Sequence, residues 1–240
     1  MAENKKKPVA VVVAVGPGTG ASLARRFAKD YALAINARSA DYLRTLGDEL
    51  RQDGAQVLEI PADIGDPAQV SSAFTRVRAE LGDPEVLLYN AGSGTWGTII
   101  EVTAEQYEAS WRVNAFGAFL CAKEVAPAMT ARGHGVMLFT GATAGVKAGA
   151  RSISFGPAKF AMRGLAQSLA RDLSPRGIHV AWINIDGGID IPRVRERYPL
   201  IKDEDLLKPD AIAETYWHLA HQDRSAWTME LELRPFKEKF

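Results

Sequence analysis

Short apolar runs rich in valine and isoleucine alternate along the chain with longer amphipathic stretches. The runs that we expect to form strands are Val9–Val15, Ala32–Asn36, Gln56–Pro61, Glu85–Tyr89, Gly135–Thr140, His179–Ile185 and Thr228–Arg234. Helical patterns lie between them, near residues 20–30, 40–53, 66–81, 103–131, 154–174 and 209–222. The first six runs are apolar on both faces, as in a buried parallel sheet, whereas the last alternates and predicts one solvated face.

The alternation of strand and helix over the whole length predicts the fold class. We expect an α/β fold with three layers, in which helices cover both faces of a doubly wound parallel sheet, the Rossmann fold. No repeat, low-complexity segment or linker divides the sequence. We therefore predict that residues 1–240 form a single domain.

Composition narrows the possible function classes. Lys plus Arg and Asp plus Glu each number 29, so the formal net charge is zero and the basic excess typical of nucleic-acid binding is missing. No apolar run approaches the roughly 18 residues that a membrane-spanning helix needs. Cys121 is the single cysteine, and His218 and His221 have no evident third ligand, so we expect neither a disulfide nor a metal site. We expect a cytoplasmic protein that binds a small molecule and neither nucleic acid nor a membrane.

A glycine-rich turn follows the first predicted strand and opens the first predicted helix. It contains Gly16, Gly18, Thr19 and Gly20. Glycines let a ligand approach the backbone closely, and the helix end offers free N–H groups, so this arrangement can hold a dinucleotide phosphate. Glycines also make ordinary turns, but the position at the first strand–helix junction favours phosphate binding.

With this turn, the sequence resembles the short-chain dehydrogenase/reductase family over nearly its entire length. The family pattern G-x-x-x-G-x-G falls on Ala14, Gly18 and Gly20, so that Ala14 replaces the first glycine and Gly16 is an extra one. An alternative register on Gly16 and Gly20 would place Ser22 at the third glycine, and we prefer the first. The resemblance implies a single NAD(P)-binding domain.

Further segments match the parts of the family that bind the cofactor. Asn90, Ala91 and Gly92 match the Asn-Ala-Gly signature, which brings the backbone close to the cofactor ribose. Asp63 and Ile64 resemble the family's Asp-Val pair, whose carboxylate accepts a hydrogen bond from the adenine amino group. A turn or a helix cap is the plain structural alternative for Asp63.

The end of the second predicted strand indicates which cofactor is preferred. An acidic residue at this place binds the ribose 2′-hydroxyl, whereas an arginine accommodates a 2′-phosphate. The sequence offers Ala37 and then Arg38, and NADP-preferring family members often carry a basic residue there. We therefore expect NADP(H) in preference to NAD(H), with a solvated surface arginine as the alternative.

After the sixth predicted strand, the family usually has Pro-Gly and then a threonine that binds the nicotinamide amide. Here Asp186 replaces the proline and Ile191 replaces the threonine. Gly187 and the backbone of Ile189 remain able to flank the nicotinamide ring. In the same segment, Arg193, Arg195 and Arg197 form either an attractive site for an anionic substrate or a solvated face.

The catalytic pattern of the family is broken. Family members use a tyrosine, a lysine four residues later, an upstream serine and an asparagine on the preceding helix. Asn114 and Lys159 match the asparagine and the lysine, but Phe155 stands at the tyrosine position and Ala142 at the serine position. Thr143, next in sequence, is a weak substitute because an unpaired threonine is a poor acid at neutral pH.

The resemblance implies an NADP-dependent oxidoreductase that transfers a hydride to or from an unidentified small substrate. A divergent subset of the family shares the Gly-Pro-Gly turn, the phenylalanine and a similar C-terminal tail. Two alternatives stay open, an NADP-binding protein without turnover (a pseudoenzyme, nucleotide sensor or scaffold) and an enoyl-type reductase of carbon–carbon double bonds. Family members mostly pair through their two long helices, here 103–131 and 154–174, so we expect a homodimer or homotetramer.

Overall fold

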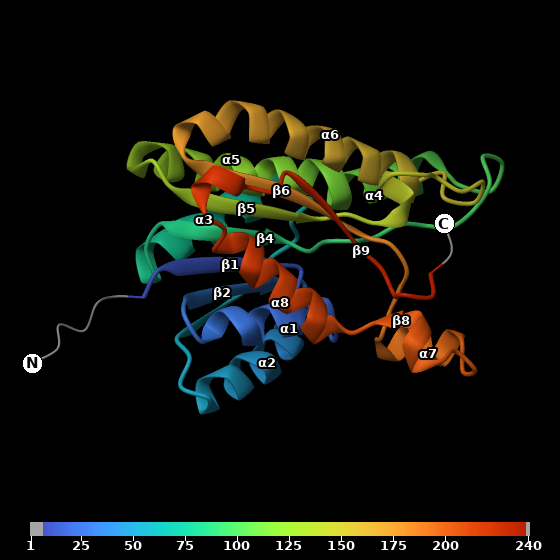
Figure 1. Cartoon of the computed structure of the whole chain (residues 1–240), viewed down its shortest axis with the longest axis horizontal. Helices are drawn as coiled ribbons and strands as arrows, with labels where there is room; N and C mark the ends of the chain where they lie inside the picture. Colours follow the sequence, from blue (N-terminus) through green and yellow to red (C-terminus); the bar gives the residue numbers. More distant parts are fainter. Residues whose placement is uncertain (1–6, 239–240) are drawn as a thin grey trace, which may run out of the picture.

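The computed structural model describes residues 7–238 and contains one large parallel sheet (Figure 1). Its strands are β1 (Val9–Val13), β2 (Ala32–Ala37), β3 (Val57–Pro61), β4 (Pro84–Tyr89), β5 (Gly135–Thr140), β6 (Ile178–Ile185) and β9 (Glu230–Leu233). They lie in the order β3-β2-β1-β4-β5-β6-β9, and every neighbouring pair is parallel. The predicted doubly wound fold is confirmed. The ends of the predicted domain, residues 1–6 and 239–240, lie outside the described residues.

Helices cover both faces of the sheet (Figure 1). They are α1 (Thr19–Ala28), α2 (Ala40–Gln52), α3 (Pro67–Glu80), α4 (Ala104–Trp111), α5 (Gly117–Arg132), α6 (Phe155–Leu173), α7 (Pro192–Arg197) and α8 (Pro209–Ala220). Helices α1, α2 and α8 pack on one face, α3, α5 and α6 pack on the other, and α4 packs against α6. Within the described residues, no helix is long and apolar enough to cross a membrane.

The strands are apolar on both faces because each face builds its own core. Val11 belongs to the core that includes Phe74 of α3, whereas the next residue, Val12, belongs to the core that includes Phe27 of α1 and Tyr216 of α8. Successive side chains of a strand point to opposite faces, so a strand buried on both sides needs a continuous apolar run. This is the pattern that the sequence shows.

Three of the differences between the structure and the sequence prediction concern the first strand, the longest predicted helix and the last strand. Strand β1 ends at Val13 rather than Val15, because Ala14 has a φ of 58° and turns the chain. The single helix expected over 103–131 is divided into α4 and α5 by a π-helical turn, Arg112–Phe116. The polar face of the last strand is only partly solvated, since Glu230 forms an ion pair with Arg163 of α6 at 2.7 Å.

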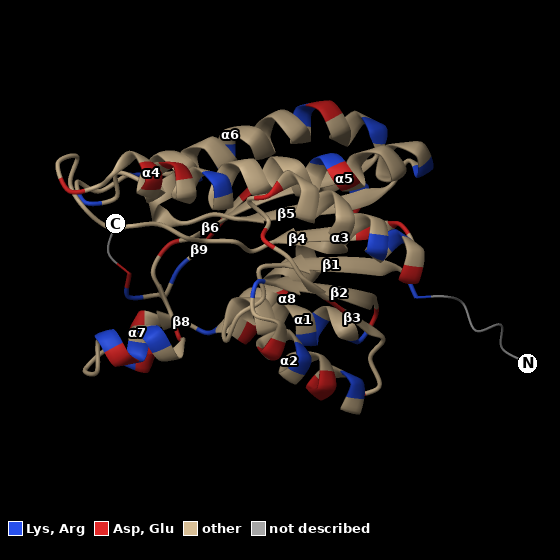
Figure 2. Cartoon of the chain, turned by 180° about the vertical axis from the view of Figure 1, so that it is seen from behind, with Lys and Arg blue, Asp and Glu red and all other residues tan. Residues whose placement is uncertain are grey.

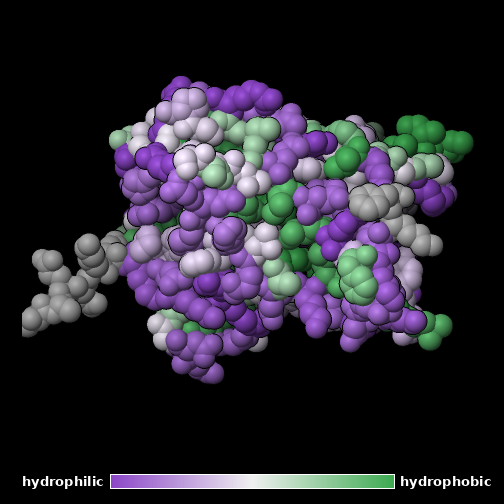
Figure 3. All heavy atoms as spheres, viewed as in Figure 1, coloured by the Kyte–Doolittle hydropathy of each residue, from purple (hydrophilic) through white to green (hydrophobic). Residues whose placement is uncertain are grey.

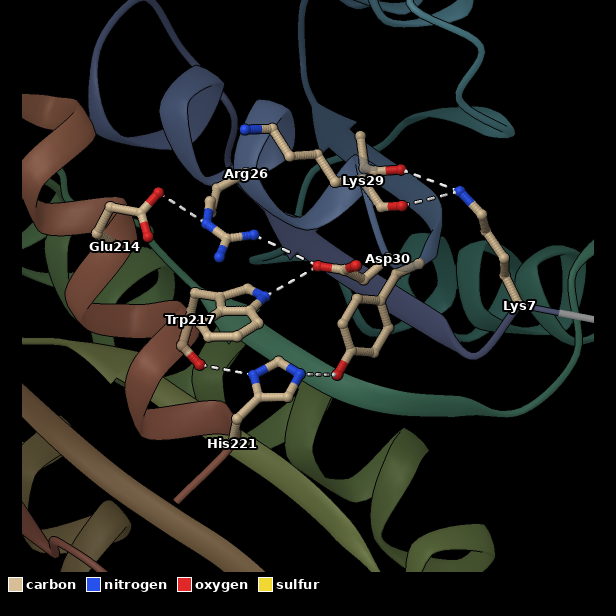
Figure 4. A network of polar contacts seen from close by, with 9 residues as sticks. Lys7, Arg26, Lys29, Asp30, Glu214, Trp217 and His221 are labelled. Carbon is tan, nitrogen blue, oxygen red and sulfur yellow. Dashed lines mark hydrogen bonds and ion pairs between the residues drawn. The ribbon is translucent and has the colours of Figure 1, made fainter.

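A polar network fixes α8 against α1 (Figure 4). The Arg26 guanidinium lies 4.0 Å from the centre of the Trp217 ring, and the Trp217 indole N–H donates to Asp30 at 3.0 Å. One ring nitrogen of His221 lies 2.7 Å from the Trp217 carbonyl oxygen and the other 3.3 Å from the Tyr31 hydroxyl. His221 therefore belongs to the contact between the helices, and α1, which follows the glycine turn, is held in place.

Candidate active site

A cavity of about 430 Å³ opens at the carboxyl ends of β1, β4, β5 and β6. From β1 the chain adds β2 and β3 on one side of the sheet, and it then returns to add β4, β5 and β6 on the other side. The strand order therefore reverses between β1 and β4, and open α/β sheets bind ligands at this place. The predicted site residues that line the cavity are Gly16, Thr19, Gly20, Asn90, Ala91, Gly92, Ala142, Phe155, Lys159, Gly187 and Ile189. Gly18, Arg38, Asp63, Ile64 and Asn114 do not line it.

The glycine turn has the backbone that its motif requires. Ala14 adopts the left-handed conformation, with a φ of 58°, where a glycine is favoured for lack of a Cβ. A Cβ on Gly20 would lie 2.7 Å from the Cα of Val15 and 3.2 Å from the Asn90 amide nitrogen. Ala14 and Gly20 thus occupy positions suited to glycine, which supports the register of the motif on Ala14, Gly18 and Gly20.

The N-terminus of α1 has donors available for an anion. The N-cap residue of α1 is Gly18, so no side chain caps the N–H groups of the first turn. This turn also contains no acidic residue that would repel an anion. The hydroxyl of Thr19 is buried and has no hydrogen-bond partner within the described residues. An unpaired buried hydroxyl is costly, and a phosphate oxygen would satisfy it.

Asn90 connects the glycine turn to the sheet. Its side-chain oxygen accepts a hydrogen bond from the Thr140 hydroxyl at 3.2 Å, and Thr140 accepts one from the buried Tyr216 hydroxyl at 2.8 Å. Its amide nitrogen donates to the carbonyl oxygen of Ala14 at 3.5 Å. Asn90 therefore positions the backbone of the turn relative to β5 and α8.

Lys159 is buried at the bottom of the cavity, with 2% of its surface exposed. Its ammonium donates to the carbonyl oxygens of Ala91 and Thr140, both at 2.9 Å. Burial lowers the pKa of Lys159 from 10.5 to about 7. The side chain is therefore fixed and able to exchange a proton near neutral pH.

Asn114 lies in the π-helical turn and is completely buried. Its amide nitrogen donates to the carbonyl oxygen of Ser93 at 2.5 Å and to that of Ser110 at 2.8 Å, whereas its side-chain oxygen has no partner among the described residues. Such turns are frequent at functional sites. Asn114 thus contacts the backbone of Ser93, which lines the cavity. Ser93 follows the Asn-Ala-Gly signature and was not predicted as a site residue.

The aromatic ring of Phe155 forms one wall of the cavity. It packs against the Trp96 ring, with centroids 5.5 Å apart, and touches Gly94 closely. Trp96 remains largely exposed, and so do Ile100 of the same loop and Leu200 beyond β6. Figure 3 shows apolar side chains exposed toward this end of the molecule. The part of the cavity near Phe155 is accordingly apolar.

Comparison with known proteins assigns the family. A model of the short chain dehydrogenase family matches residues 8–196. The chain belongs to this family. It is 31% identical over 178 residues to the short-chain dehydrogenase/reductase eriH of Hericium erinaceus, which covers 72% of this chain and 71% of that protein.

Solved structures of other members have the same fold. A short-chain dehydrogenase from Rhodopseudomonas palustris matches with a TM-score of 0.82 and 31% identity over 97% of this chain and 100% of that one. A metagenomic short-chain oxidoreductase in complex with NADP matches with a TM-score of 0.84 and 25% identity over 95% and 96% of the two chains. This chain is thus a member of an oxidoreductase family.

Three hydroxyl groups that lie close in sequence to Ala142 and Phe155 are already engaged. Thr143 donates to Asp186 at 2.6 Å, Ser152 to the Gly149 carbonyl oxygen at 2.8 Å and Ser154 to the Thr95 carbonyl oxygen at 2.8 Å. Each of these groups would have to give up an existing hydrogen bond to polarise a substrate carbonyl. None is therefore a ready substitute for a catalytic serine or tyrosine.

Asp186, at the place of the family's usual proline, is a buried anchor. Burial raises its pKa, but the Thr143 hydroxyl and the Arg234 guanidinium lower it more, and the net pKa lies below the ordinary value. Arg234 follows β9 and forms an ion pair with Asp186. The residue therefore fastens the end of β6 to the C-terminal part of the chain.

The residues expected to bind the adenosine half lie beyond the cavity. Arg38 is exposed directly after β2 and has no ion-pair partner among the described residues. Asp63 accepts a hydrogen bond from the Gly65 N–H at 2.8 Å through one oxygen, and Ile64 packs in the core that contains α3. Asp63 thus forms the turn that was the structural alternative to adenine binding. The second carboxylate oxygen of Asp63 takes no part in the hydrogen bond to Gly65.

Proposed function

We propose that this chain is an NADP(H)-dependent oxidoreductase that transfers a hydride between the nicotinamide and an unidentified small substrate. The observation that carries this proposal is that the glycine turn, with its unpaired Thr19 hydroxyl, and the buried Lys159 ammonium open onto the same cavity. Family membership and the NADP bound by a solved relative support it.

The residues of the cavity fit a dinucleotide. The turn from Gly16 to Gly20 and the start of α1 would hold the diphosphate, because the first turn of α1 offers free N–H groups and the buried Thr19 hydroxyl has no partner among the described residues. Lys159 and the Asn90–Gly92 backbone would contact the ribose of the nicotinamide half, and Gly187 and Ile189 would flank the ring. When bound there, NADP(H) supplies or accepts the hydride.

The preference for NADP(H) rests on Arg38. It lies at the end of β2, next to the strand that leads into the glycine turn, and its guanidinium is exposed. A guanidinium binds phosphate through two parallel hydrogen bonds, which makes it suited to the 2′-phosphate. No carboxylate stands at Ala37 to favour the free hydroxyl of NAD.

Proton transfer is the weak point of the site. Lys159 is able to exchange a proton near neutral pH, but Phe155 and Ala142 offer no hydroxyl to a substrate oxygen. Loss of a positioned acid costs about 10²–10⁴-fold in rate, so simple ketones should be reduced slowly. The engaged hydroxyls of Thr143, Ser152 and Ser154 favour, as a second candidate, a nucleotide-binding protein without turnover.

Calorimetric titration with NADPH and NADH tests cofactor binding. We expect Arg38→Gln to weaken NADPH binding by about tenfold, as for the loss of one charge-assisted contact, and to leave NADH binding unchanged. Arg44→Gln is the matched control, because Arg44 lies on the following helix and pairs with Asp41 at 3.4 Å. Absence of any nucleotide binding would overturn both candidate functions.

Turnover distinguishes the two candidates once binding is established. Oxidation of NADPH is followed with simple ketones and with enoyl thioesters as substrates. Reduction of either class of substrate supports the oxidoreductase, and enoyl reduction alone assigns it to carbon–carbon double bonds. Tight binding of NADPH with no turnover of either class supports the nucleotide-binding protein. Rapid ketone reduction would contradict the account of the catalytic positions.

A further inference from the structure

A separate segment extends from the end of β6 and returns to α8. This lid segment, residues 186–208, contains β7 (Gly188–Ile189), α7 and β8 (Leu206–Leu207), and β7 pairs with β8. It stands beside the body of the molecule, and α7 carries many charged residues (Figures 1 and 2).

The lid segment is fastened by ion pairs. Arg195 binds Asp190 and Asp203, both at 2.7 Å, which holds the two halves of the segment together. Lys237, near the C-terminus, forms an ion pair with Glu204. The first two ion pairs lie within the lid segment, and the third joins it to the C-terminal part of the chain.

Part of the lid segment lies directly over the glycine turn. A Cβ added to Gly18 would collide with the Ile191 side chain, so Ile191 is in contact with this glycine. Arg193 lies two residues further along, and it lines the same cavity as Gly16 and Pro17. The phosphate turn is therefore covered from one side by a segment that carries an arginine.

Among the three arginines of α7, Arg193 is the one that faces the cavity. Arg195 is neutralised by its two aspartates, and the Arg197 guanidinium lies 5.7 Å from the Tyr198 ring. Arg193 is exposed, with no carboxylate partner within residues 7–238. None of the described residues that line the cavity is acidic, so Lys159 and Arg193 together make it electropositive.

We propose that Arg193 binds the diphosphate of the nucleotide from the lid side, opposite the N-terminus of α1. This inference rests on the proposed function. The glycine turn supplies backbone N–H groups and no basic side chain of its own, so a cation on the opposite side would add a charge-assisted contact to the diphosphate. The contact of Ile191 with Gly18 places the lid at the phosphate turn, which favours the diphosphate over an anionic substrate beside Phe155.

Binding of NADPH and NADH to Arg193→Gln tests the inference without any substrate. We expect both nucleotides to bind about tenfold more weakly, because both carry the diphosphate, and we expect this loss to shrink at high salt. The pattern differs from that of Arg38→Gln, which affects NADPH alone. Arg197→Gln is the matched control on the same helix and should change neither affinity.

The outcomes separate this inference from the proposed function. If wild-type protein binds neither nucleotide, the proposed function fails. If it binds both nucleotides and Arg193→Gln binds them with unchanged affinity, the role of Arg193 is wrong and the proposed function stands. Loss of NADPH affinity alone in Arg193→Gln would assign the residue to the 2′-phosphate and would also overturn the inference.

Discussion

The Lys159 ammonium lies 5.6 Å from the centre of the Phe155 ring, within the range of a cation–π contact. The two residues are four apart on α6 and share one face of that helix. By family resemblance, a tyrosine hydroxyl belongs where this ring stands. The lysine thus faces a ring that carries no oxygen atom.

Restoring the two hydroxyls should create or increase ketone reduction. In Phe155→Tyr with Ala142→Ser, the new tyrosine would share a helix face with Lys159, whose positive charge stabilises a phenolate, and the serine would polarise the carbonyl. We expect the NADPH-dependent reduction of a simple ketone to rise by about 10²–10⁴-fold, the usual contribution of a positioned acid. Initial rates at saturating NADPH measure it.

The single variants and a neutral substitution serve as controls for this gain. Phe155→Tyr alone should give a smaller increase, and Phe155→Leu should give none, since it removes the ring without adding a hydroxyl. NADPH affinity should stay the same in all of them. A wild-type enzyme that already reduces ketones rapidly, with no gain in the double variant, would show that another group supplies the proton.

The buried Lys159 should make stability depend on pH. Its pKa is about 7 in the folded chain and 10.5 without burial, so between these values the unfolded chain binds more protons and stability rises with pH. From pH 7 to pH 9, the free energy of unfolding of the wild type should rise by roughly 2 kcal/mol relative to that of Lys159→Met. Urea unfolding of both proteins without nucleotide measures it.

The comparison with Lys159→Met isolates the effect of this one group, because all other titrating groups are common to both proteins. The variant leaves the carbonyl oxygens of Ala91 and Thr140 without their donor, which lowers its stability by an amount that does not depend on pH. Parallel stability curves from pH 7 to pH 9 would show that Lys159 titrates near its ordinary pKa in the folded protein.

The order of elements and much of the cavity were predictable from the sequence because their signals are local. A strand, a glycine turn and a helix follow one another within a few residues, and Asn90–Gly92 directly follows a strand. Parallel strands then bring such turns to one edge of the sheet. The positions of Lys159 and Phe155 followed from their spacing on one helix.

Features that depend on tertiary contacts were not predictable. The π-helical turn places Asn114 against Ser93, and neither residue type signals it. The lid segment consists of a six-residue helix and two-residue strands, which are too short for hydrophobic periodicity to reveal. The partner of Thr143 is Asp186, 43 residues away, so only the folded chain shows that this hydroxyl is engaged.

Exchanges at two positions of the glycine motif should have different effects. Ala14→Gly relieves a left-handed conformation that costs an alanine about 1–2 kcal/mol, partly offset by the greater freedom of glycine in the unfolded chain. We expect an equal or slightly higher melting temperature with NADPH affinity retained. Gly20→Ala should lower both, because its Cβ would lie 2.7 Å from the Cα of Val15. Thermal unfolding and calorimetry measure the two effects.

We propose that the chain forms a homodimer through its two long helices, and an aromatic patch provides the test. Trp111, Phe116 and Phe119 stack with ring centroids 5.2 and 6.4 Å apart, and Trp111 and Phe119 are about two-fifths exposed. Burial of this patch against a second copy would remove apolar surface from water. Phe119→Glu would place a charge in this buried interface. We expect the variant to be a monomer, and light scattering measures its mass.

The control for this variant is Leu200→Glu, which adds the same charge at an almost fully exposed apolar residue of the lid segment. It should leave the dimer intact, because the lid segment lies away from α4 and α5 (Figure 1). Dissociation by Leu200→Glu but not by Phe119→Glu would move the interface to the lid end of the molecule. A monomeric wild type would overturn the proposal of a homodimer, and the aromatic patch would then stay exposed to solvent.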